Sequence, residues 1–354
     1  MSSHPRQDHA EPAARPLVVK IPPDSHGLPA DADLAHLGQI LREGGLVALP
    51  TETVYGLAAN ALDPEAVARI FAAKERPSFN PLIVHIAESH EIAGLVLRMP
   101  ELATRLADAF WPGPLTLVLP RTDAVPDIVT GGLDTVGVRM PSHPVARAVI
   151  RAAGVPLAAP SANLFTRVSP TTAEHVLEQL RDRIDAIVDA GPSEVGIEST
   201  VVAVDSGPDG DRVVLLRPGG ISRAALEAVV GQISDPEIEE SAEEARRSPG
   251  RIERHYAPQA RLLGIERDAS GELVVPNAAE GPIAVISCGP VAKSCHADLQ
   301  FALDRDPSGF ARGLYAALHA CDAAGCQIIY VERIPAGDPA WEAVADRLQR
   351  AGLQ

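Results

Sequence analysis

Short apolar runs that alternate with amphipathic stretches constrain the fold of this chain more than any other feature. Apolar runs of strand length lie at 46–49, 81–86, 115–119, 135–139, 157–159, 186–189, 200–204 and 213–216. Helical spacing of apolar residues lies at 33–41, 64–74, 103–110, 144–153 and 173–180. Because strands and helices that alternate along a chain pack as a sheet covered by helices, the pattern predicts a mixed α/β domain over residues 31–230.

Residues 231–258 interrupt this pattern. A run of glutamates lies between positions 237 and 244, and Arg-Arg-Ser-Pro-Gly follows at 246–250, a composition typical of an exposed linker. Beyond it, apolar runs and helical stretches alternate again, at 281–287, 308–324, 327–332 and 339–351. Strands joined by helices pair in parallel, so we expect a small Rossmann-like parallel α/β domain over residues 259–354.

The N-terminal residues 1–30 lack sustained apolar periodicity and are predicted to form a disordered or loosely ordered tail. They also lack the basic-then-apolar order of a secretory signal. No stretch approaches the ~18 unbroken apolar residues of a membrane-spanning helix. We therefore expect a cytoplasmic protein that does not enter a membrane.

Charge and cysteine spacing disfavour two kinds of partner. Lysine and arginine number 31 against 47 aspartates and glutamates, a formal net charge of −16 that repels nucleic-acid phosphates. At 3% aromatic residues, stacking platforms for bases are scarce as well, so no stable direct nucleic-acid binding is expected. The four cysteines, Cys288, Cys295, Cys321 and Cys326, match no zinc-ribbon or CxxC spacing, and we assign no metal site to them.

The common phosphate-binding signatures, GxxxxGK[ST] and GxGxxG, are absent from the sequence. Instead, polar loops border several predicted strands, where side chains can be held over a cleft. The first is Pro-Thr-Glu-Thr-Val-Tyr-Gly-Leu at 50–57. Taken alone, this loop is either part of a site or a polar turn whose Tyr55 packs on the core.

The second polar loop, residues 74–85, places two cations, an amide and a histidine around two prolines. Guanidinium and ammonium groups neutralise phosphate oxygens, and proline lowers the entropy cost of ordering a loop, so the loop suits a triphosphate. The alternative is a solvated helix end followed by a core histidine, His85.

Further polar residues border later strands. Arg139 ends an apolar run, and because an unpaired buried arginine is costly, it meets a carboxylate of the protein or of a ligand; composition favours the protein. Ser161 and Ser169 lie in turns where a serine is often only a helix cap. Glu-Ser-Thr-Val-Val at 198–202 and Arg-Pro-Gly at 217–219 repeat this arrangement.

In their order along the chain, these motifs resemble the YrdC-like domain of threonylcarbamoyl-AMP synthases. PTETVYGL, KxRP with NPL, PSAN and ESTVV carry the resemblance, which spans about residues 34–230. Ser-Pro-Gly at 248–250, His-Tyr-Ala-Pro at 255–258 and the small α/β unit that follows resemble the longer, two-domain type of the family. The resemblance implies a mixed twisted sheet with helices and a nucleotidyltransferase activity.

Such enzymes condense L-threonine, bicarbonate or CO2, and ATP with Mg2+ to threonylcarbamoyl-AMP and pyrophosphate, and a separate threonylcarbamoyl transferase then modifies tRNA. Carried over by motif, the resemblance implies that threonine meets Thr53, His85, Arg139 and Ser199, with Arg139 on its carboxylate. It implies that ATP meets Arg76, Asn80, Thr135, Ser161, Ser169 and Arg217. Lys74 and Arg76 would be the catalytic cations, and Tyr256 would belong to a lid formed by the linker.

This chemistry needs no protein nucleophile, because a carbamate oxygen that attacks the α-phosphorus requires only positioning and neutralisation of charge. We assign no protein side chain as a metal ligand and no general base; His85 is a candidate for the base by residue type alone. The alternative function is a non-catalytic ATP- or RNA-binding regulatory protein of the same fold. Threonine-dependent release of pyrophosphate distinguishes the two.

Overall fold

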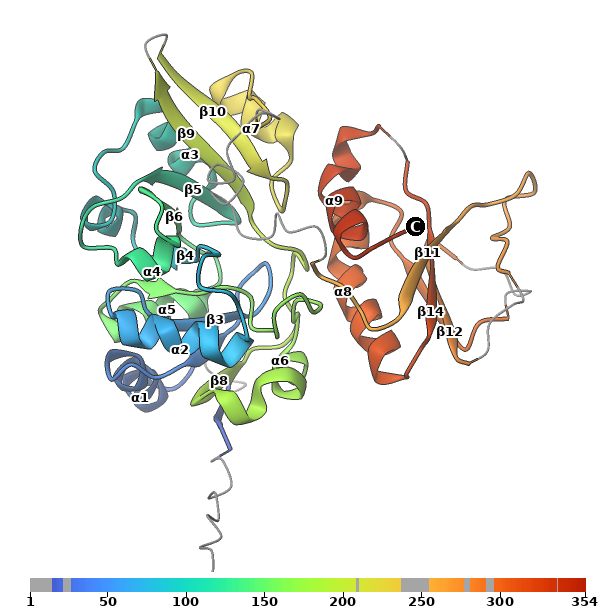
Figure 1. The fold of residues 1–354 in the computed structure, drawn as a ribbon, viewed down its shortest axis with the longest axis horizontal. Helices are drawn as coiled ribbons and strands as arrows, with labels where there is room; N and C mark the ends of the chain where they lie inside the picture. Colours follow the sequence, from blue (N-terminus) through green and yellow to red (C-terminus); the bar gives the residue numbers. More distant parts are fainter. Residues whose placement is uncertain are drawn as a thin grey trace, which may run out of the picture.

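The computed structural model describes residues 15–21, 27–207, 210–236, 255–276, 281–290, 296–335 and 337–354. These residues form two units that lie side by side, each built on one sheet (Figure 1). The larger sheet consists of β1 (Leu17–Lys20), β2 (Val47–Leu49), β3 (Gly56–Asn60), β4 (Ile83–His85), β5 (Leu115–Pro120), β6 (Thr135–Arg139), β7 (Leu157–Ala158), β8 (Ala186–Asp189), β9 (Thr200–Gly207) and β10 (Gly210–Arg217).

The larger sheet is mixed, as predicted. Its strand order is β1-β8-β2-β3-β7-β4-β6-β5-β9-β10. Parallel pairs such as β4/β6 and β5/β9 alternate with antiparallel pairs such as β2/β3 and β5/β6. All eight apolar runs that predicted strands in this unit are strands, whereas β1 and β3 were not expected.

Helices cover both faces of the larger sheet, but unequally. One face carries α2 (Pro64–Lys74), α3 (Glu101–Phe110), α4 (Asp127–Thr130), α6 (Ala173–Leu180) and α7 (Arg223–Val230), which share its core. The other face carries α1 (Asp31–Arg42) and α5 (Pro144–Ala153), which pack on β1, β2 and β8. Two 3-10 helices, η1 (Ser89–Gly94) and η2 (Arg181–Arg183), lie in the connections.

Strand alternation shows which side chains lie on the part of the second face where no described helix packs. On β4, Val84 packs in the helix-covered core, so Ile83 and His85 point to the opposite face. Over β4, β5, β9 and β10 that face holds a small apolar cluster that includes Ile83, Val201 and Leu216. Every described member of the cluster comes from a strand, and polar side chains at the strand ends can therefore border a cavity there.

The predicted N-terminal tail is wrong in part. Leu17–Lys20 form β1 at the edge of the larger sheet, parallel to β8. Only Val19 is buried, while the other three residues are exposed. A strand with a single buried position carries almost no period-two signal, so the sequence could not reveal it. Residues 1–14 and 22–26 lie outside the described residues.

The smaller unit is the parallel α/β domain that the sequence predicted. Its strands are β11 (Arg261–Ile265), β12 (Ile283–Cys288), β13 (Leu299–Leu303) and β14 (Ile328–Glu332), in the order β11-β14-β12-β13. All of its recorded strand pairs are parallel. Its helices are α8 (Pro307–Ala323), η4 (Pro339–Trp341) and α9 (Glu342–Arg350). β11 and β13 were not expected, and the predicted last helix divides into η4 and α9.

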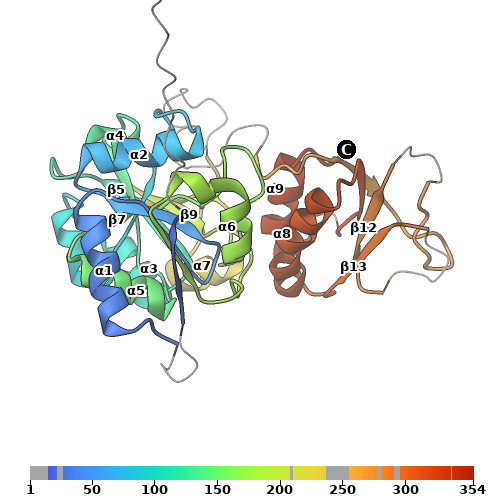
Figure 2. The ribbon, with the colours of Figure 1, turned by 90° about the horizontal axis from the view of Figure 1, so that it is seen from below.

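The two units share a hydrophobic core. α8 and α9 lie between the smaller sheet and the larger unit (Figure 2). Val54 and Ile197 of the larger unit pack in one cluster with Leu314 of α8. A Cβ at Gly196 would lie 2.5 Å from the Cα atom of Arg312, so only glycine permits this close approach. The segment just before Glu198 thus packs closely against the C-terminal domain.

The last part of the predicted linker, residues 231–258, packs against the rest of the protein. His255, Tyr256 and Ala257 are buried, and the Ala257 N–H donates to the Thr166 carbonyl at 2.9 Å. The expected exposure is therefore wrong for these three residues, while the glutamate run and Ser-Pro-Gly lie outside the described residues. In the part of the chain that the structure describes, no helix is long and apolar enough to cross a bilayer.

Candidate active site

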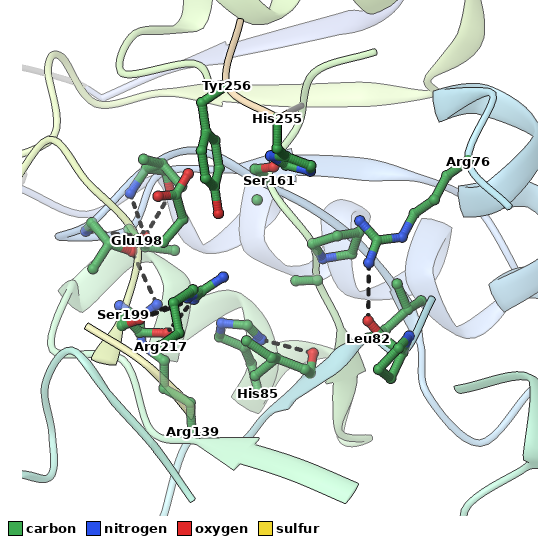
Figure 3. Close-up of a pocket in the computed structure, with 18 residues that line it drawn as sticks. Arg76, Leu82, His85, Arg139, Ser161, Glu198, Ser199, Arg217, His255 and Tyr256 are labelled. Carbon is green, nitrogen blue, oxygen red and sulfur yellow. Dashed lines mark hydrogen bonds between the residues drawn. The ribbon is translucent and has the colours of Figure 1, made fainter. Parts of the chain in front are cut away.

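A cavity opens where the second face of the larger sheet is uncovered (Figure 3). About 560 Å³ of this region is not filled by protein atoms, a volume that includes open solvent at its mouth. Eight residues that the resemblance assigned to substrates or lid line it: Thr53, Arg76, His85, Arg139, Ser161, Ser199, Arg217 and Tyr256. Residues far apart in the sequence are thus brought together at one site.

The loop between β2 and β3 brings Thr53 to the cavity. Thr51 Oγ1 closes the turn by accepting hydrogen bonds from the backbone N–H groups of Thr53 and Val54, at 3.2 and 3.3 Å. Tyr55 is fully buried, and its hydroxyl donates to the Gly191 carbonyl at 2.7 Å. Both interpretations of this loop are therefore correct: it is a polar turn with a core tyrosine, and it also lines the cavity.

Arg139, at the end of β6, pairs with a carboxylate of the protein, the option that composition favoured. Its Nη2 lies 2.7 Å from Glu52 Oε1, and both side chains are buried. Burial opposes ionisation of Glu52, but the Arg139 guanidinium outweighs it and holds the pKa of that carboxyl below its usual value. Arg139 also donates to Thr53 Oγ1 at 3.0 Å and to the Gly113 carbonyl at 3.3 Å.

The Arg139 guanidinium carries five N–H donors. Its contacts with Glu52, Thr53 and Gly113 use three of them among the described residues. The other two have no partner among the described residues.

His85, at the end of β4, is held as the neutral imidazole. Its Nδ1 lies 3.2 Å from the Ile83 carbonyl, which can only accept, so Nδ1 carries the proton and Nε2 keeps its lone pair. Burial, assisted by the nearby Arg139 charge, lowers the pKa of His85 to about 3. The side chain can thus accept a hydrogen bond from a ligand at neutral pH.

The two cations at the end of α2, Lys74 and Arg76, extend in different directions. Glu75 adopts a left-handed conformation (φ 54°) that ends the helix between them. Lys74 turns into the protein and donates to the carbonyls of Ser161 and Asn163, where burial lowers its pKa well below the usual value. Lys74 was expected to be a catalytic cation, but it is not among the residues that line the cavity.

Arg76 lines the cavity instead. Its Nη2 donates to the Pro81 carbonyl at 3.0 Å, and its guanidinium lies 5.9 Å from the Phe165 ring centroid. Burial, with the nearby Arg217 charge, lowers its pKa to about 10, so it remains charged at neutral pH. Among the described residues no carboxylate forms an ion pair with Arg76, and a buried cation of this kind favours an anionic ligand.

Ser199, just before the start of β9, and Arg217, at the end of β10, are joined by hydrogen bonds. Arg217 donates through Nε to the Ser199 carbonyl at 3.2 Å and through Nη2 to Ser199 Oγ at 3.2 Å. A Cβ at Gly219 would lie 2.4 Å from the Glu198 carbonyl oxygen. The Arg-Pro-Gly motif therefore needs its glycine so that the turn can pack directly against the segment 198–200.

Three other predicted ATP-binding residues do not line the cavity. Ser169 Oγ donates to Glu198 Oε1 at 2.6 Å and is buried. Asn80 is buried beside the cavity wall, and its Nδ2 has no partner among the described residues. Thr135 begins β6 while Arg139 ends it, and four residues of extended strand separate them by about 13 Å. Thr135 lies on the same face of β6 as Arg139, two residues before Gly137, which pairs with the cavity-lining Ile83.

The last residues of the predicted linker close one side of the cavity. Tyr256 has φ 61° and is fully buried, and its hydroxyl has no partner among the described residues. His255 lines the cavity beside it, and burial with the Arg76 charge lowers its pKa to about 3. Tyr256 points toward the cavity, as a lid residue would (Figure 3).

Glu52, Glu198 and His255 were not assigned in the sequence. Each stands directly beside an assigned residue: Glu52 before Thr53, Glu198 before Ser199, and His255 before Tyr256. The sequence predicts that a buried arginine, Arg139, meets a carboxylate. An acidic residue inside one of the polar motifs is therefore the signal that could have identified the two glutamates. Nothing local identifies His255, because its burial depends on contacts across the chain.

The chain matches two families in succession. Residues 39–219 match the family described as "Telomere recombination", and residues 221–352 match "Threonylcarbamoyl-AMP synthase, C-terminal domain". It is 45% identical over 302 residues to the threonylcarbamoyl-AMP synthase of Pyrococcus abyssi, with 83% of this chain and 86% of the relative covered. It is 44% identical over 318 residues to that of Bacillus subtilis, with 86% and 89% covered.

A solved structure agrees with the fold. The structure of the Pyrococcus abyssi Sua5 protein complexed with L-threonine matches with a TM-score of 0.80 and 37% identity, covering 95% of this chain and 97% of that chain. The fold and site, with these relatives, define an enzyme of the nucleotidyltransferase class. Within that class the chain belongs to the threonylcarbamoyl-AMP synthase family.

Proposed function

We propose that this protein is an L-threonylcarbamoyladenylate synthase, which condenses L-threonine, bicarbonate or CO2, and ATP to threonylcarbamoyl-AMP and pyrophosphate. The observation that carries the proposal is the composition of one cavity. A cation without a carboxylate partner among the described residues, Arg76, faces the same space as Arg139 with its two remaining donors and the neutral His85. An anionic nucleotide and an amino acid fit these two ends.

At the amino-acid end, Arg139 would bind the threonine carboxylate through its remaining N–H donors. Glu52 neutralises part of the arginine's charge and fixes the guanidinium, so the binding geometry is set before the ligand arrives. His85 Nε2 would accept a hydrogen bond from the substrate amine or hydroxyl, and the hydroxyls of Thr53 and Ser199 would complete the contacts.

At the nucleotide end, Arg76 and Arg217 would neutralise phosphate oxygens, and Ser161 would donate to the nucleotide. The carbamate oxygen would then attack the α-phosphorus while the bond to pyrophosphate breaks, so a fixed pair of substrates and two cations suffice. Tyr256 and His255 would keep water away from the labile carbamate, since both side chains are buried against the cavity.

We propose that Mg2+ enters with the triphosphate. The described residues contain no group of three or more His, Cys, Asp or Glu side chains that could hold a metal ion. Glu198, which lines the cavity, and Glu52, which lies behind Arg139, are both engaged by arginines. These residues fit an ion carried mainly by phosphate oxygens and water, with hydroxyls such as that of Ser161 as further oxygen donors. Bound in this way, the ion would neutralise charge on the leaving pyrophosphate.

We also propose a cytoplasmic role in tRNA modification, in which the product passes to a separate threonylcarbamoyl transferase. Membership in this family and the absence of a membrane-spanning helix among the described residues support the role. The net charge of −16 favours transfer of the small product over direct binding of tRNA by this chain.

Pyrophosphate release tests the proposed function. Purified protein is incubated with ATP, Mg2+ and bicarbonate, with and without L-threonine, and the nucleotide product is identified by mass. We expect release that depends on threonine and a product with the mass of threonylcarbamoyl-AMP. Binding of ATP without turnover would overturn the proposal in favour of a non-catalytic regulatory protein.

A further inference from the structure

Arg347, in α9 of the C-terminal domain, is the largest of the fully buried side chains. Its Nε lies 2.7 Å from Glu198 Oε2, and Glu198 belongs to the larger unit and lines the cavity. The ion pair therefore connects the C-terminal domain directly to the wall of the proposed active site.

Three protein groups donate to the Glu198 carboxylate. Oε1 accepts from Ser169 Oγ at 2.6 Å, and Oε2 accepts from Arg347 at 2.7 Å and from the hydroxyl of Tyr315, on α8, at 3.1 Å. Burial opposes ionisation, but Arg347 and then Arg217 outweigh it and lower the pKa of Glu198 to about 2. Glu198 is thus a buried anion whose position is fixed by donors from both units.

Arg347 also holds two other parts of the cavity wall. Its Nη2 donates to the Pro218 carbonyl at 3.0 Å, one residue after Arg217. Its guanidinium lies 5.1 Å from the ring centroid of Tyr256, at a distance suited to a cation–π contact. One side chain therefore touches the segments before Ser199 and after Arg217, and the proposed lid.

Stability alone does not account for this arrangement. Replacing a buried ion pair by well-packed apolar residues is often neutral or stabilising, so a domain interface gains little from burying one. The contacts of Arg347 do, however, fix the backbone on both sides of the Ser199–Arg217 pair, which an apolar side chain could not do.

We infer that Arg347 is a positioning residue through which the C-terminal domain completes the active site: it fixes Glu198, the 217–219 turn and Tyr256 in the geometry that the substrates require. The inference rests on the proposed function. It gives the C-terminal domain a direct part in the reaction of the larger unit, because without α9 the carboxylate of Glu198 would be left buried without the arginine that compensates it.

Four variants test this role. Arg347→Met removes the donors and keeps an apolar stem, and Arg347→Lys keeps the charge without the planar fork. Glu198→Gln combined with Arg347→Met removes the uncompensated carboxylate as well. The matched control is Arg350→Ala, because Arg350 lies on the same helix, pairs with Asp346 at 2.8 Å and does not line the cavity.

Steady-state pyrophosphate release is measured against threonine and against ATP, from pH 5 to 9, with thermal unfolding of each variant. We expect Arg347→Met to lower kcat/KM for both substrates by about tenfold or more, and Arg350→Ala to stay within about twofold of the parent. Arg347→Lys should recover part of the loss. The double variant should regain thermal stability but not activity, because the neutral pair no longer fixes the wall.

The pH profile separates positioning from mere stability. Removing Arg347 removes a cation that lowers the pKa of Glu198, so Arg347→Met should lose activity on the acid side at a higher pH than the parent does. The double variant, which has no carboxylate at position 198, should lack this acid limb. The charged or titratable groups that face Glu198 are Arg347 from α9, Arg217 from β10, Tyr315 from α8, and Tyr256 and His255 from the lid segment.

Two results would overturn the inference while leaving the proposed function intact: an Arg347→Met variant that matches Arg350→Ala in both kcat/KM values, or a double variant that recovers full activity together with stability. A parent protein that releases no pyrophosphate would refute the proposed function instead. In that event the role of Arg347 is tested by measuring ATP binding by calorimetry. We expect Arg347→Met to bind ATP about tenfold more weakly than Arg350→Ala does. Equal affinities would overturn the inference that Arg347 positions the cavity wall.

Discussion

Replacement of Arg139 by methionine separates two roles that the structure gives to one side chain. Arg139 neutralises Glu52, which is buried beside it at 2.7 Å, and it presents its remaining N–H donors to the proposed threonine site. Arg139→Met fills a similar volume but removes the charge. The variant should therefore lose both folding stability and the use of threonine, for different reasons.

The two losses have different magnitudes. Leaving one partner of a buried ion pair uncompensated costs about 3–5 kcal/mol. In a unit of this size each kcal/mol shifts Tm by roughly 2–4 °C, so Tm should fall by roughly 6–20 °C. Loss of a charge-assisted hydrogen bond to the threonine carboxylate costs about 1.5–3 kcal/mol, which lowers kcat/KM for threonine about 10- to 150-fold.

The double variant Glu52→Gln with Arg139→Met distinguishes the two effects. It removes the uncompensated carboxylate, so thermal unfolding should return to within a few degrees of the parent, while kcat/KM for threonine stays low. KM for ATP, measured in the same pyrophosphate assay, should change by less than about threefold in both variants. Recovery of threonine use in the double variant would refute the assignment of Arg139 to the substrate carboxylate, and an unchanged Tm in the single variant would refute the ion-pair argument.

Four further outcomes are expected. Arg76→Met should raise KM for ATP by about tenfold or more with little effect on Tm, because no described carboxylate is left unpaired; a larger effect on KM for threonine would contradict the assignment. Lys74→Met should leave the carbonyls of Ser161 and Asn163 without a buried donor, at about 1–3 kcal/mol each, so calorimetry should record a lower Tm and kinetics should record equal losses for both substrates. Acid should destabilise the fold: between pH 6.5 and 3 the unfolded chain binds protons that His85 and His255, with folded pKa values of about 3, do not, which removes up to about 1.4 kcal/mol per pH unit and per histidine in denaturant titrations. His85→Asn should make that dependence shallower, and a slope equal to the parent's would argue against a buried neutral His85. EDTA should abolish pyrophosphate release without changing Tm of the ligand-free protein, and a fall in Tm would point to a resident metal site.

The fold could be predicted wherever an element buries a continuous apolar run. All eight expected strands of the larger sheet exist, because central strands covered by helices have to be apolar along their length. Two of the strands that escaped prediction have another character. β1 buries one residue of four, and β13 alternates between half-buried and exposed positions. β3 buries four of its five residues, but it begins inside the motif at 50–57 and contains two alanines, which have low strand propensity, so its pairing with β2 becomes visible only in the sheet.

The cavity was predictable from motifs because strand ends collect at one edge of the uncovered sheet face. His85 and Arg139 lie on neighbouring parallel strands in direct register, which is why residues 54 positions apart in the chain share a site. Thr135 shows the limit of the same reasoning. It lies on the same strand as Arg139 but does not line the cavity, and a motif gives no information about how far along a strand a cavity extends.

Lys74 and Arg76 show why a pair of cations in one motif need not share a role. Both stand within a loop that suits a triphosphate, and charge alone makes them equivalent. The left-handed Glu75 between them ends the helix. Lys74 faces the interior, and its ammonium group donates to two carbonyls of the Pro-Ser-Ala-Asn turn. By fixing that turn, Lys74 sets the position of Ser161 at the cavity, while Arg76 lines the cavity itself. The two cations at this helix end therefore have different roles: Lys74 holds the cavity wall, and Arg76 places a buried charge at the cavity.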